Sequence, residues 1–328
     1  MTLFKKNLKI KNILVTGASG FIGSHFCEML IKNNYNVIGV DNFYNSSKKY
    51  IKNLFNLKNF TFIKKDVRKI DKNPKIFNNI DLAIHLASNT DIINSHDNPD
   101  ADFSNTLETT NSLLKLLKEN NIKNLIFSSS GACYGDLCLS LKVNEKSGPL
   151  NPLSSYAAAK ISSEALISSY SHLYGIKACA FRFGNVIGDR MSHGVIFDFI
   201  KRLRKNPSKL EIYGNGKQIK NYFLVNDCIE GMIKLYNNTK FNPEHPFEIY
   251  NIGAKNRTNV KKIAKIVLEE MNLKKTKIII EGDKKAWPGD QPIVNFSINK
   301  AHKNGWTCSV SSDDAVKKAT KLYLKNIF

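Results

Sequence analysis

The sequence predicts an α/β protein, in which a doubly wound parallel sheet is joined to a smaller mixed α/β lobe. In the first half of the 328-residue chain, short and nearly continuous apolar runs alternate with amphipathic stretches. This pattern is typical of parallel strands covered by helices on both faces. After about residue 184, glycine and asparagine turns become frequent. We therefore expect a sheet domain over residues 1–183, which also receives segment 222–252, and a second lobe over residues 184–328.

The expected strands are the apolar runs that turn residues bound on both sides. They lie at residues 12–16, 37–40, 60–63, 82–86, 125–128 and 177–183. Helical patterns fit between them, notably at residues 104–119 and 154–174. In the second lobe, residues 260–271 carry their apolar side chains on one helical face, which predicts an amphipathic helix.

The chain is strongly basic, with a formal net charge of +21. It holds 43 Lys, only 6 Arg and 39 Asn. Nucleic-acid recognition favours Arg, whose planar fork bonds bidentately to phosphates and bases. Because the basic residues are Lys spread from end to end, we interpret the charge as a solvated surface and expect no nucleic-acid partner. A nucleic-acid-binding protein remains the alternative outside the enzymes.

Other features of the sequence concern location and metals. No stretch approaches the roughly 20 apolar residues of a membrane span, so no membrane partner is expected. The N-terminus lacks the apolar core of a signal peptide, so we expect a cytoplasmic protein. The six cysteines show no C-x-x-C spacing and are expected to be reduced thiols. No His, Cys and Asp cluster has the spacing of metal ligands, so no metal is predicted.

Residues 17–23 read Gly-Ala-Ser-Gly-Phe-Ile-Gly and connect the first expected strand to a helix. Glycines at 17, 20 and 23 allow a tight turn, close approach of a pyrophosphate and close packing of helix on strand. The next strand ends at Asp41, which can accept hydrogen bonds from ribose hydroxyls and would repel a 2′-phosphate. The pattern predicts a Rossmann-type domain with NAD as its cofactor.

A second pattern is Tyr156-Ala-Ala-Ala-Lys160. Residues four apart share a helix face, so the ammonium lies one turn from the phenol. A free tyrosine is a poor base near neutral pH, and a neighbouring lysine favours the phenolate. Upstream, Ser128–Ser130 ends an expected strand at the carboxyl edge of the sheet, where open α/β sheets bind ligands.

Together these motifs resemble the extended short-chain dehydrogenase/reductases, in the branch of NAD-dependent nucleotide-sugar epimerases and dehydratases that are UDP-glucose 4-epimerase-like. The resemblance rests on Thr16–Gly23, Asp41–Ser46, Asp66-Val67, His85–Ala87, Asn105, Ser128–Gly135, Tyr156-x-x-x-Lys160 and Arg182–Gly188. It implies a domain that holds NAD, a lobe that grips the diphosphate of a nucleoside-diphosphate sugar, and a homodimer formed through the helices at 104–119 and 154–174.

The resemblance also implies site residues. The implied catalytic residues are Tyr156 as general base, Lys160 beside it, and Ser130 as the hydroxyl that orients the substrate. The implied cofactor-binding residues are Gly17, Gly20, Phe21, Ile22, Gly23, Asp41, Asn42, Asn45, Ser46, Asp66, Val67, Leu86, Ala87, Ser88, Asn105, Ser128, Tyr156, Lys160 and Phe183. The implied substrate-binding residues are Ser130, Asn185, Val195, Tyr213, Lys220, Trp287 and Asp290.

The type of reaction depends on the two residues that follow Ser130. Dehydratases of the family need an acid pair there, and decarboxylases carry a carboxylate nearby, whereas this chain has Gly131 and Ala132. The resemblance therefore implies epimerisation through a 4-keto sugar, in which the C4 hydride leaves and returns. Net C4 oxidation or reduction is the nearest alternative, followed by dehydration or decarboxylation. Similar epimerases often have Arg in place of Lys220, so the base and the sugar stay open.

Overall fold

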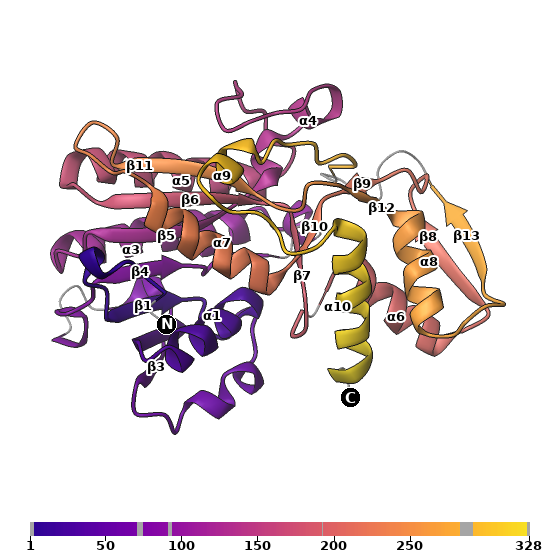
Figure 1. Ribbon diagram of the computed structural model, residues 1–328, viewed down its shortest axis with the longest axis horizontal. Helices are drawn as coiled ribbons and strands as arrows, with labels where there is room; N and C mark the ends of the chain where they lie inside the picture. Colours follow the sequence, from indigo (N-terminus) through magenta and orange to yellow (C-terminus); the bar gives the residue numbers. More distant parts are fainter. Residues whose placement is uncertain (1–2, 71–74, 91–93, 192, 283–290, 327–328) are drawn as a thin grey trace.

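The computed structural model describes residues 3–70, 75–90, 94–191, 193–282 and 291–326. A seven-stranded sheet forms the larger part of the molecule, and a smaller lobe lies beside it (Figure 1). All the strand pairs of this sheet are parallel, in the order β11-β6-β5-β4-β1-β2-β3. The predicted fold class, a Rossmann-type doubly wound parallel sheet, is confirmed.

The elements alternate in the first half of the chain and mix in the second. The strands of the large sheet are β1 (Asn12–Thr16), β2 (Asn36–Asp41), β3 (Phe60–Lys64), β4 (Leu82–His85), β5 (Asn124–Ser130), β6 (Lys177–Phe183) and β11 (Phe247–Ile252). The helices that accompany it are α1 (Phe21–Lys32), α2 (Asp100–Asp102), α3 (Thr109–Glu119), α4 (Leu137–Ser140), α5 (Ser155–Tyr174), α7 (Val225–Asn238) and α9 (Asn299–Lys303).

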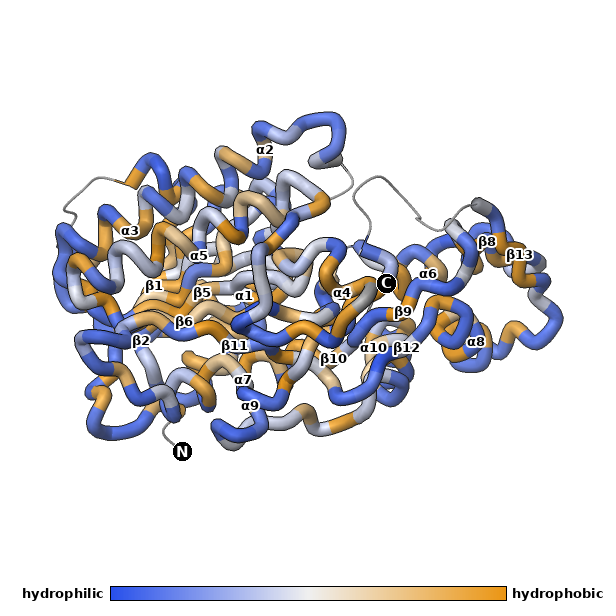
Figure 2. Tube along the Cα trace, turned by 90° about the horizontal axis from the view of Figure 1, so that it is seen from above, coloured by the Kyte–Doolittle hydropathy of each residue, from blue (hydrophilic) through white to orange (hydrophobic). Residues whose placement is uncertain are grey.

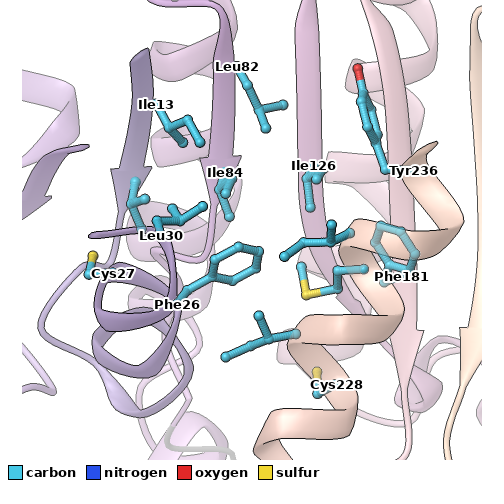
Figure 3. Packing of buried hydrophobic residues seen from close by; sticks show 14 of the residues in the cluster. Ile13, Phe26, Cys27, Leu30, Leu82, Ile84, Ile126, Phe181, Cys228 and Tyr236 are labelled. Atoms are coloured by element: carbon cyan, nitrogen blue, oxygen red, sulfur yellow. The ribbon is translucent and has the colours of Figure 1, made fainter. Parts of the chain in front are cut away.

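Two hydrophobic clusters sandwich this sheet, because successive side chains of a strand point to opposite faces. In β1, Ile13 packs with Phe26 of α1 and with α7, whereas the next residue, Leu14, packs with α3 and α5. Figure 3 shows the first cluster, in which Phe26 of α1 lies beside Ile84 of β4, with Phe181 of β6 farther along the sheet. The tight packing of α1 on the sheet holds the glycine turn before it in place.

The smaller lobe has its own hydrophobic cluster, built by α6, α8 and α10 around a pair of strands. Its elements are β7 (Asn185–Ile187), α6 (Val195–Lys205), β8 (Lys209–Tyr213), β9 (Ile219–Lys220), β10 (Tyr222–Leu224), β12 (Thr258–Asn259), α8 (Val260–Glu270), β13 (Lys277–Glu281) and α10 (Ser312–Asn326). Hydrophobic residues line the inward faces of these helices (Figure 2).

Between the two parts the chain crosses more than once. After β7 and α6 it returns through α7 to β11, which pairs with β6 at the edge of the large sheet. Residues 222–252 thus lie mostly against the sheet although they follow part of the lobe in sequence. Among the described residues, no helix is both long and apolar enough to cross a membrane.

One expected helix differs from the prediction. The sequence predicts a regular helix over 104–119, but residues Phe103–Glu108 form a π-helix and the α-helix begins at Thr109. Side-chain hydroxyls bond back to main-chain carbonyls in this stretch: Thr109 Oγ1 to Ser104 O at 3.1 Å and Thr110 Oγ1 to Thr106 O at 2.7 Å. Such bonds compete with the helical pattern, and π-turns are frequent at functional sites.

Candidate functional site

A cavity of about 310 Å³ opens at the carboxyl edge of the large sheet. It lies where the strand order reverses, since β1 has β2 on one side and β4 on the other. Ligands of open α/β sheets bind at such switch points. All 19 residues predicted to contact the cofactor line this cavity: Gly17, Gly20, Phe21, Ile22, Gly23, Asp41, Asn42, Asn45, Ser46, Asp66, Val67, Leu86, Ala87, Ser88, Asn105, Ser128, Tyr156, Lys160 and Phe183.

The glycine turn forms one wall of the cavity. A Cβ on Gly23 would stand 2.0 Å from the carbonyl oxygen of Gly17, and one on Gly17, whose φ is +72°, would stand 2.7 Å from the nitrogen of Ala87. The N-cap of α1 is Gly20, which offers no side chain to its first N–H groups. The backbone therefore forms a concave surface that a side chain at either glycine would fill, beside an uncapped helix N-terminus. This arrangement fits the pyrophosphate of a dinucleotide.

Asp41 is held in one orientation at the end of β2. Its carboxylate accepts hydrogen bonds from the main-chain nitrogens of Ser19 (3.0 Å) and Phe43 (2.8 Å) and from Ser46 Oγ (2.7 Å). The residue is buried, yet it lines the cavity. This placement agrees with its predicted contact to the ribose hydroxyls.

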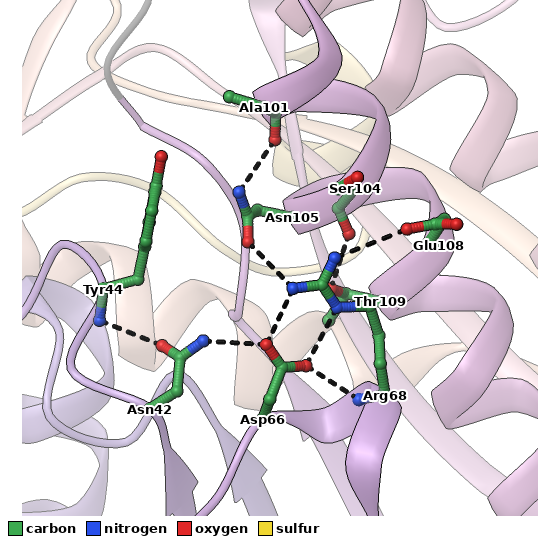
Figure 4. A network of polar contacts seen from close by, with 9 residues as sticks. All are labelled: Asn42, Tyr44, Asp66, Arg68, Ala101, Ser104, Asn105, Glu108 and Thr109. Carbon is green, nitrogen blue, oxygen red and sulfur yellow. Dashed lines mark hydrogen bonds and ion pairs between the residues drawn. The ribbon is translucent and has the colours of Figure 1, made fainter.

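At the far end of the cavity, a polar network joins β3 to the π-helix (Figure 4). Arg68 grips Asp66 through Nε at 3.0 Å and Nη2 at 2.8 Å, and this lowers the pKa of Asp66 to about 2. The same guanidinium reaches Asn105 and Glu108, both at 3.4 Å, and Asn42 donates to Asp66 at 3.0 Å. Arg68 thus positions three predicted cofactor contacts without lining the cavity itself.

The sequence interpretation missed Arg68. The only signal available was its position two residues after Asp66, in a chain with six arginines. The variant Arg68→Gln is expected to have a dissociation constant for NAD about tenfold higher, because Asp66 loses its hydrogen bonds to the guanidinium and is free to reorient. Equilibrium titration with NAD measures the change.

Arg204→Gln, on the exposed face of α6, is the matched control and is expected to leave NAD affinity unchanged. Equal affinity of Arg68→Gln and the wild type would show that the network does not position the adenosine end of the site.

The predicted catalytic residues meet at the opposite end of the cavity. Lys160 Nζ donates to Ser128 O at 2.7 Å and lies 5.8 Å from the centroid of the Tyr156 ring. Ser130 ends β5, accepts a hydrogen bond from Ala132 N at 3.1 Å, and bonds to Tyr156. The three side chains predicted from the sequence are therefore brought together by β5 and the first two turns of α5.

The electrostatics of this group differ from the simple expectation. Burial raises the pKa of Tyr156, and the hydrogen bond to Ser130 only partly opposes it. Burial also lowers the pKa of Lys160 to about 8. From the sequence, Lys160 is expected to favour the phenolate of Tyr156. In the folded protein, desolvation is the largest effect on the pKa of Tyr156, so the protein's own groups favour the neutral phenol.

Replacing Lys160 with Met is expected to change how stability depends on pH. The lysine has a pKa of about 8 in the folded protein and an ordinary value of 10.5, so between these values the unfolded chain binds more protons at this position. The free energy of unfolding of the wild type therefore rises relative to Lys160→Met across this window, by about 3 kcal/mol in total.

Urea unfolding of both proteins without NAD, on either side of the window, measures this difference. The exposed Lys234→Met is the control, and its difference from the wild type is expected to stay constant with pH. A constant difference for Lys160→Met as well would contradict the lowered pKa.

Beneath the catalytic group lies a buried ion pair that the sequence interpretation also missed. Arg182 of β6 bonds to Glu164 of α5 through Nε at 2.9 Å and Nη2 at 2.6 Å, and Ser129 donates to the same carboxylate. Glu164 follows Tyr156 and Lys160 at intervals of four residues, on the same helix face. The pair therefore ties the catalytic face of α5 to β5 and β6.

The residue after Ser130 has no room for an acid. A Cβ on Gly131 would stand 2.8 Å from Phe183 O and 2.9 Å from the ring of Phe296. Next to it stand the methyl group of Ala132 and the buried thiol of Cys133, whose pKa burial raises to about 12. The carboxylates that dehydratases and decarboxylases were expected to carry here are replaced by apolar packing.

The predicted substrate-binding residues are more dispersed. Asn185 begins β7, Val195 begins α6, Tyr213 ends β8 and Lys220 lies in β9. Within the described part of the chain, these four do not line the cofactor cavity. Trp287 and Asp290 lie outside the described residues. No group of three or more His, Cys, Asp or Glu side chains that could hold a metal occurs in the described ranges.

Known proteins share this sequence pattern and this fold. A sequence profile of the NAD dependent epimerase/dehydratase family matches residues 13–253. The chain belongs to this family. It is therefore a nucleotide-sugar epimerase/dehydratase family enzyme, and the predicted cofactor, NAD, is confirmed.

Individual relatives of this family enzyme differ in activity. A protein of Methanocaldococcus jannaschii, named as a candidate UDP-glucose 4-epimerase, is 34% identical over 96% of this chain and 98% of its own length. The crystal structure of UDP-glucuronic acid 4-epimerase from Bacillus cereus with UDP-glucuronic acid and NAD has a TM-score of 0.86 and 28% identity, covering 97% of this chain and 100% of that one. UDP-glucuronic acid decarboxylase 4 of Arabidopsis thaliana is 30% identical over 80% of this chain and 58% of its own.

Proposed function

We propose that this chain is an NAD-dependent nucleotide-sugar 4-epimerase. The observation that carries the proposal is that Tyr156 and Lys160 line the cofactor cavity and Ser130 bonds to Tyr156, next to a position where Gly131 excludes an acid. A proton acceptor is present at the sugar end of the site, and no nearby group in residues 131–134 can drive elimination. Reversible oxidation at one carbon is the chemistry that this set supports best.

In the proposed cycle, the positive charges of Lys160 and of oxidised NAD favour the phenolate of Tyr156, whose Oη takes the proton of the sugar 4-hydroxyl while the C4 hydrogen leaves as hydride. Ser130 holds the same hydroxyl, and Lys160 keeps a positive charge near the phenol. NAD supplies the hydride acceptor and, when oxidised, a second positive charge. The 4-keto sugar turns over within the pocket, receives the hydride on its other face, and takes the proton back from Tyr156.

The substrate side of the proposal rests on the lobe. We propose that residues 1–183 with segment 222–252 bind NAD, and that the remainder of 184–328 binds the nucleoside diphosphate. Asn185 and Lys220 would contact the diphosphate, Val195 and Tyr213 would contact the substrate within the lobe, and Ser130 would contact the sugar. Trp287 and Asp290 complete the proposed set. Support comes from a relative whose name includes UDP-glucose and from a related crystal structure that contains UDP-glucuronic acid.

The test is to incubate the purified protein with UDP-glucose, UDP-GlcNAc and UDP-glucuronate and to follow the sugar stereochemistry by NMR. We expect one of them to give its 4-epimer with no net gain of NADH. NADH that accumulates in proportion to substrate, without an epimer, would replace the proposal with net C4 oxidation. Carbon dioxide release from UDP-glucuronate would replace it with decarboxylation.

We further propose that the enzyme is a cytoplasmic homodimer that pairs through α3 and α5. These helices cover one face of the sheet, and Leu173 near the end of α5 is 68% exposed (Figure 1). All six cysteines are free. Sedimentation equilibrium is expected to show a dimer, and Leu173→Glu is expected to weaken it. A wild-type monomer at micromolar concentration would contradict this proposal.

A further inference from the structure

Arg190 and Tyr50 lie between the cofactor cavity and an outer cleft. The outer cleft is lined by Glu28, Lys49, Tyr50, Lys52, Asn53 and Arg190. Of these, only Tyr50 and Arg190 also line the cofactor cavity in the described part of the chain. Arg190 Nη1 donates to Tyr50 O at 3.4 Å, so this contact forms the wall between the two spaces.

The guanidinium of Arg190 is anchored to the first helix. Its Nη2 lies 2.8 Å from Glu28 Oε1, across 162 residues of sequence. Asn53 donates to the same carboxylate oxygen at 3.0 Å. Burial raises the pKa of Glu28, but these hydrogen bonds more than offset it, and the pKa is lowered overall. The two side chains are only 19% and 15% exposed, so the solvent screens their attraction weakly.

The backbone around Arg190 is also tied to α1. His25 Nε2 lies 3.2 Å from Asp189 O, one residue before the arginine. Arg190 itself has φ +67°, the left-handed region that side chains with a Cβ seldom adopt. Such a conformation persists where surrounding contacts hold it. Here those contacts join the residues after β7 to the helix whose N-terminus faces the pyrophosphate site.

We propose that the Arg190–Glu28 ion pair retains the dinucleotide by closing the cofactor cavity beside α1. The inference rests on the proposed epimerase cycle, because a hydride that returns to the same sugar requires a cofactor that does not leave between the two transfers. Arg190 acts as a wall of the cavity, and Glu28 is a positioning residue that acts through Arg190. Breaking the pair joins the cavity to the outer cleft and opens a path for release.

The test measures NAD dissociation from the purified holoenzyme in the absence of any sugar nucleotide, by trapping the released NAD. Arg190→Gln and Glu28→Gln are each expected to speed dissociation about tenfold. Because both variants remove the same contact, the double variant is expected to be no faster than either alone. Glu230→Gln, an exposed carboxylate on α7, is the charge-matched control and is expected to stay within about twofold of the wild type.

A dissociation rate for Glu28→Gln within about twofold of the wild type would overturn the proposal, even if Arg190→Gln is fast. In that case the arginine would act on NAD directly. Thermal midpoints of the NAD-free proteins show whether a variant is folded, and Glu28→Asp, which keeps the charge but shortens the reach, replaces Glu28→Gln if needed. Since no sugar is present, the outcome is independent of whether the enzyme epimerises.

Discussion

Tyr156→Phe is expected to lower kcat for epimerisation by about 10³-fold or more. The substitution removes only the hydroxyl, which in the proposed cycle accepts and returns the proton of the 4-hydroxyl. General acid–base catalysis by a positioned side chain contributes about 10²–10⁴-fold, and here the same oxygen acts in both half-reactions. The measurement is the initial rate of epimer formation on the substrate identified by NMR.

Two observations distinguish the loss of the Tyr156 hydroxyl from a general disruption of the cavity. The bound NAD content of Tyr156→Phe is expected to equal that of the wild type, because the rest of the cavity lining is intact. Tyr170→Phe, on the same helix and packed edge-on against Tyr174, is the matched control and is expected to retain activity. A Tyr156→Phe enzyme with more than about a tenth of the wild-type kcat would require a different base.

Arg182→Met is expected to lower the free energy of unfolding by about 3–5 kcal/mol. Both members of its pair are almost fully buried, at 4% and 6% exposure, so the variant leaves the Glu164 carboxylate without its cation in the interior. Among the described residues, Arg182 Nη1 has no hydrogen-bond partner, and the guanidinium packs 4.8 Å from the ring centroid of Tyr134. Urea unfolding of the NAD-free protein measures the loss.

The double variant Arg182→Met/Glu164→Leu is expected to recover most of that stability, since replacing both members of a buried pair by apolar groups is often nearly neutral. Lys262→Met breaks an exposed ion pair with Asp313 and is expected to cost less than about 1 kcal/mol. If Arg182→Met cost no more than this control, burial of the pair would not explain its role.

The architecture was predictable because it depends on local patterns. Apolar runs specify buried parallel strands, and the glycines at 17–23 can only form a tight turn between a strand and a helix. The π-helix before α3 was not predictable, because the pattern of apolar residues is the same for a regular helix.

The raised pKa of Tyr156 was not predictable either. The spacing of Tyr156 and Lys160 shows that they share a face, but the dominant effect on both pKa values is burial. Burial depends on which distant segments of the chain pack over the helix, and a local sequence pattern does not contain that information.

Patterns of residues close together along the chain predict the fold class and the cofactor, which are confirmed, and three catalytic side chains, which remain a prediction. The folded chain shows how three of the six arginines are used: Arg68, Arg182 and Arg190 each form an ion pair with a carboxylate of another element. Their partners in other elements, Glu108, Glu164 and Glu28, lie 40, 18 and 162 residues away, so these contacts form only after the chain has folded. The abundant lysines account for the net charge of +21, whereas three of the six arginines line the site or hold its residues in position.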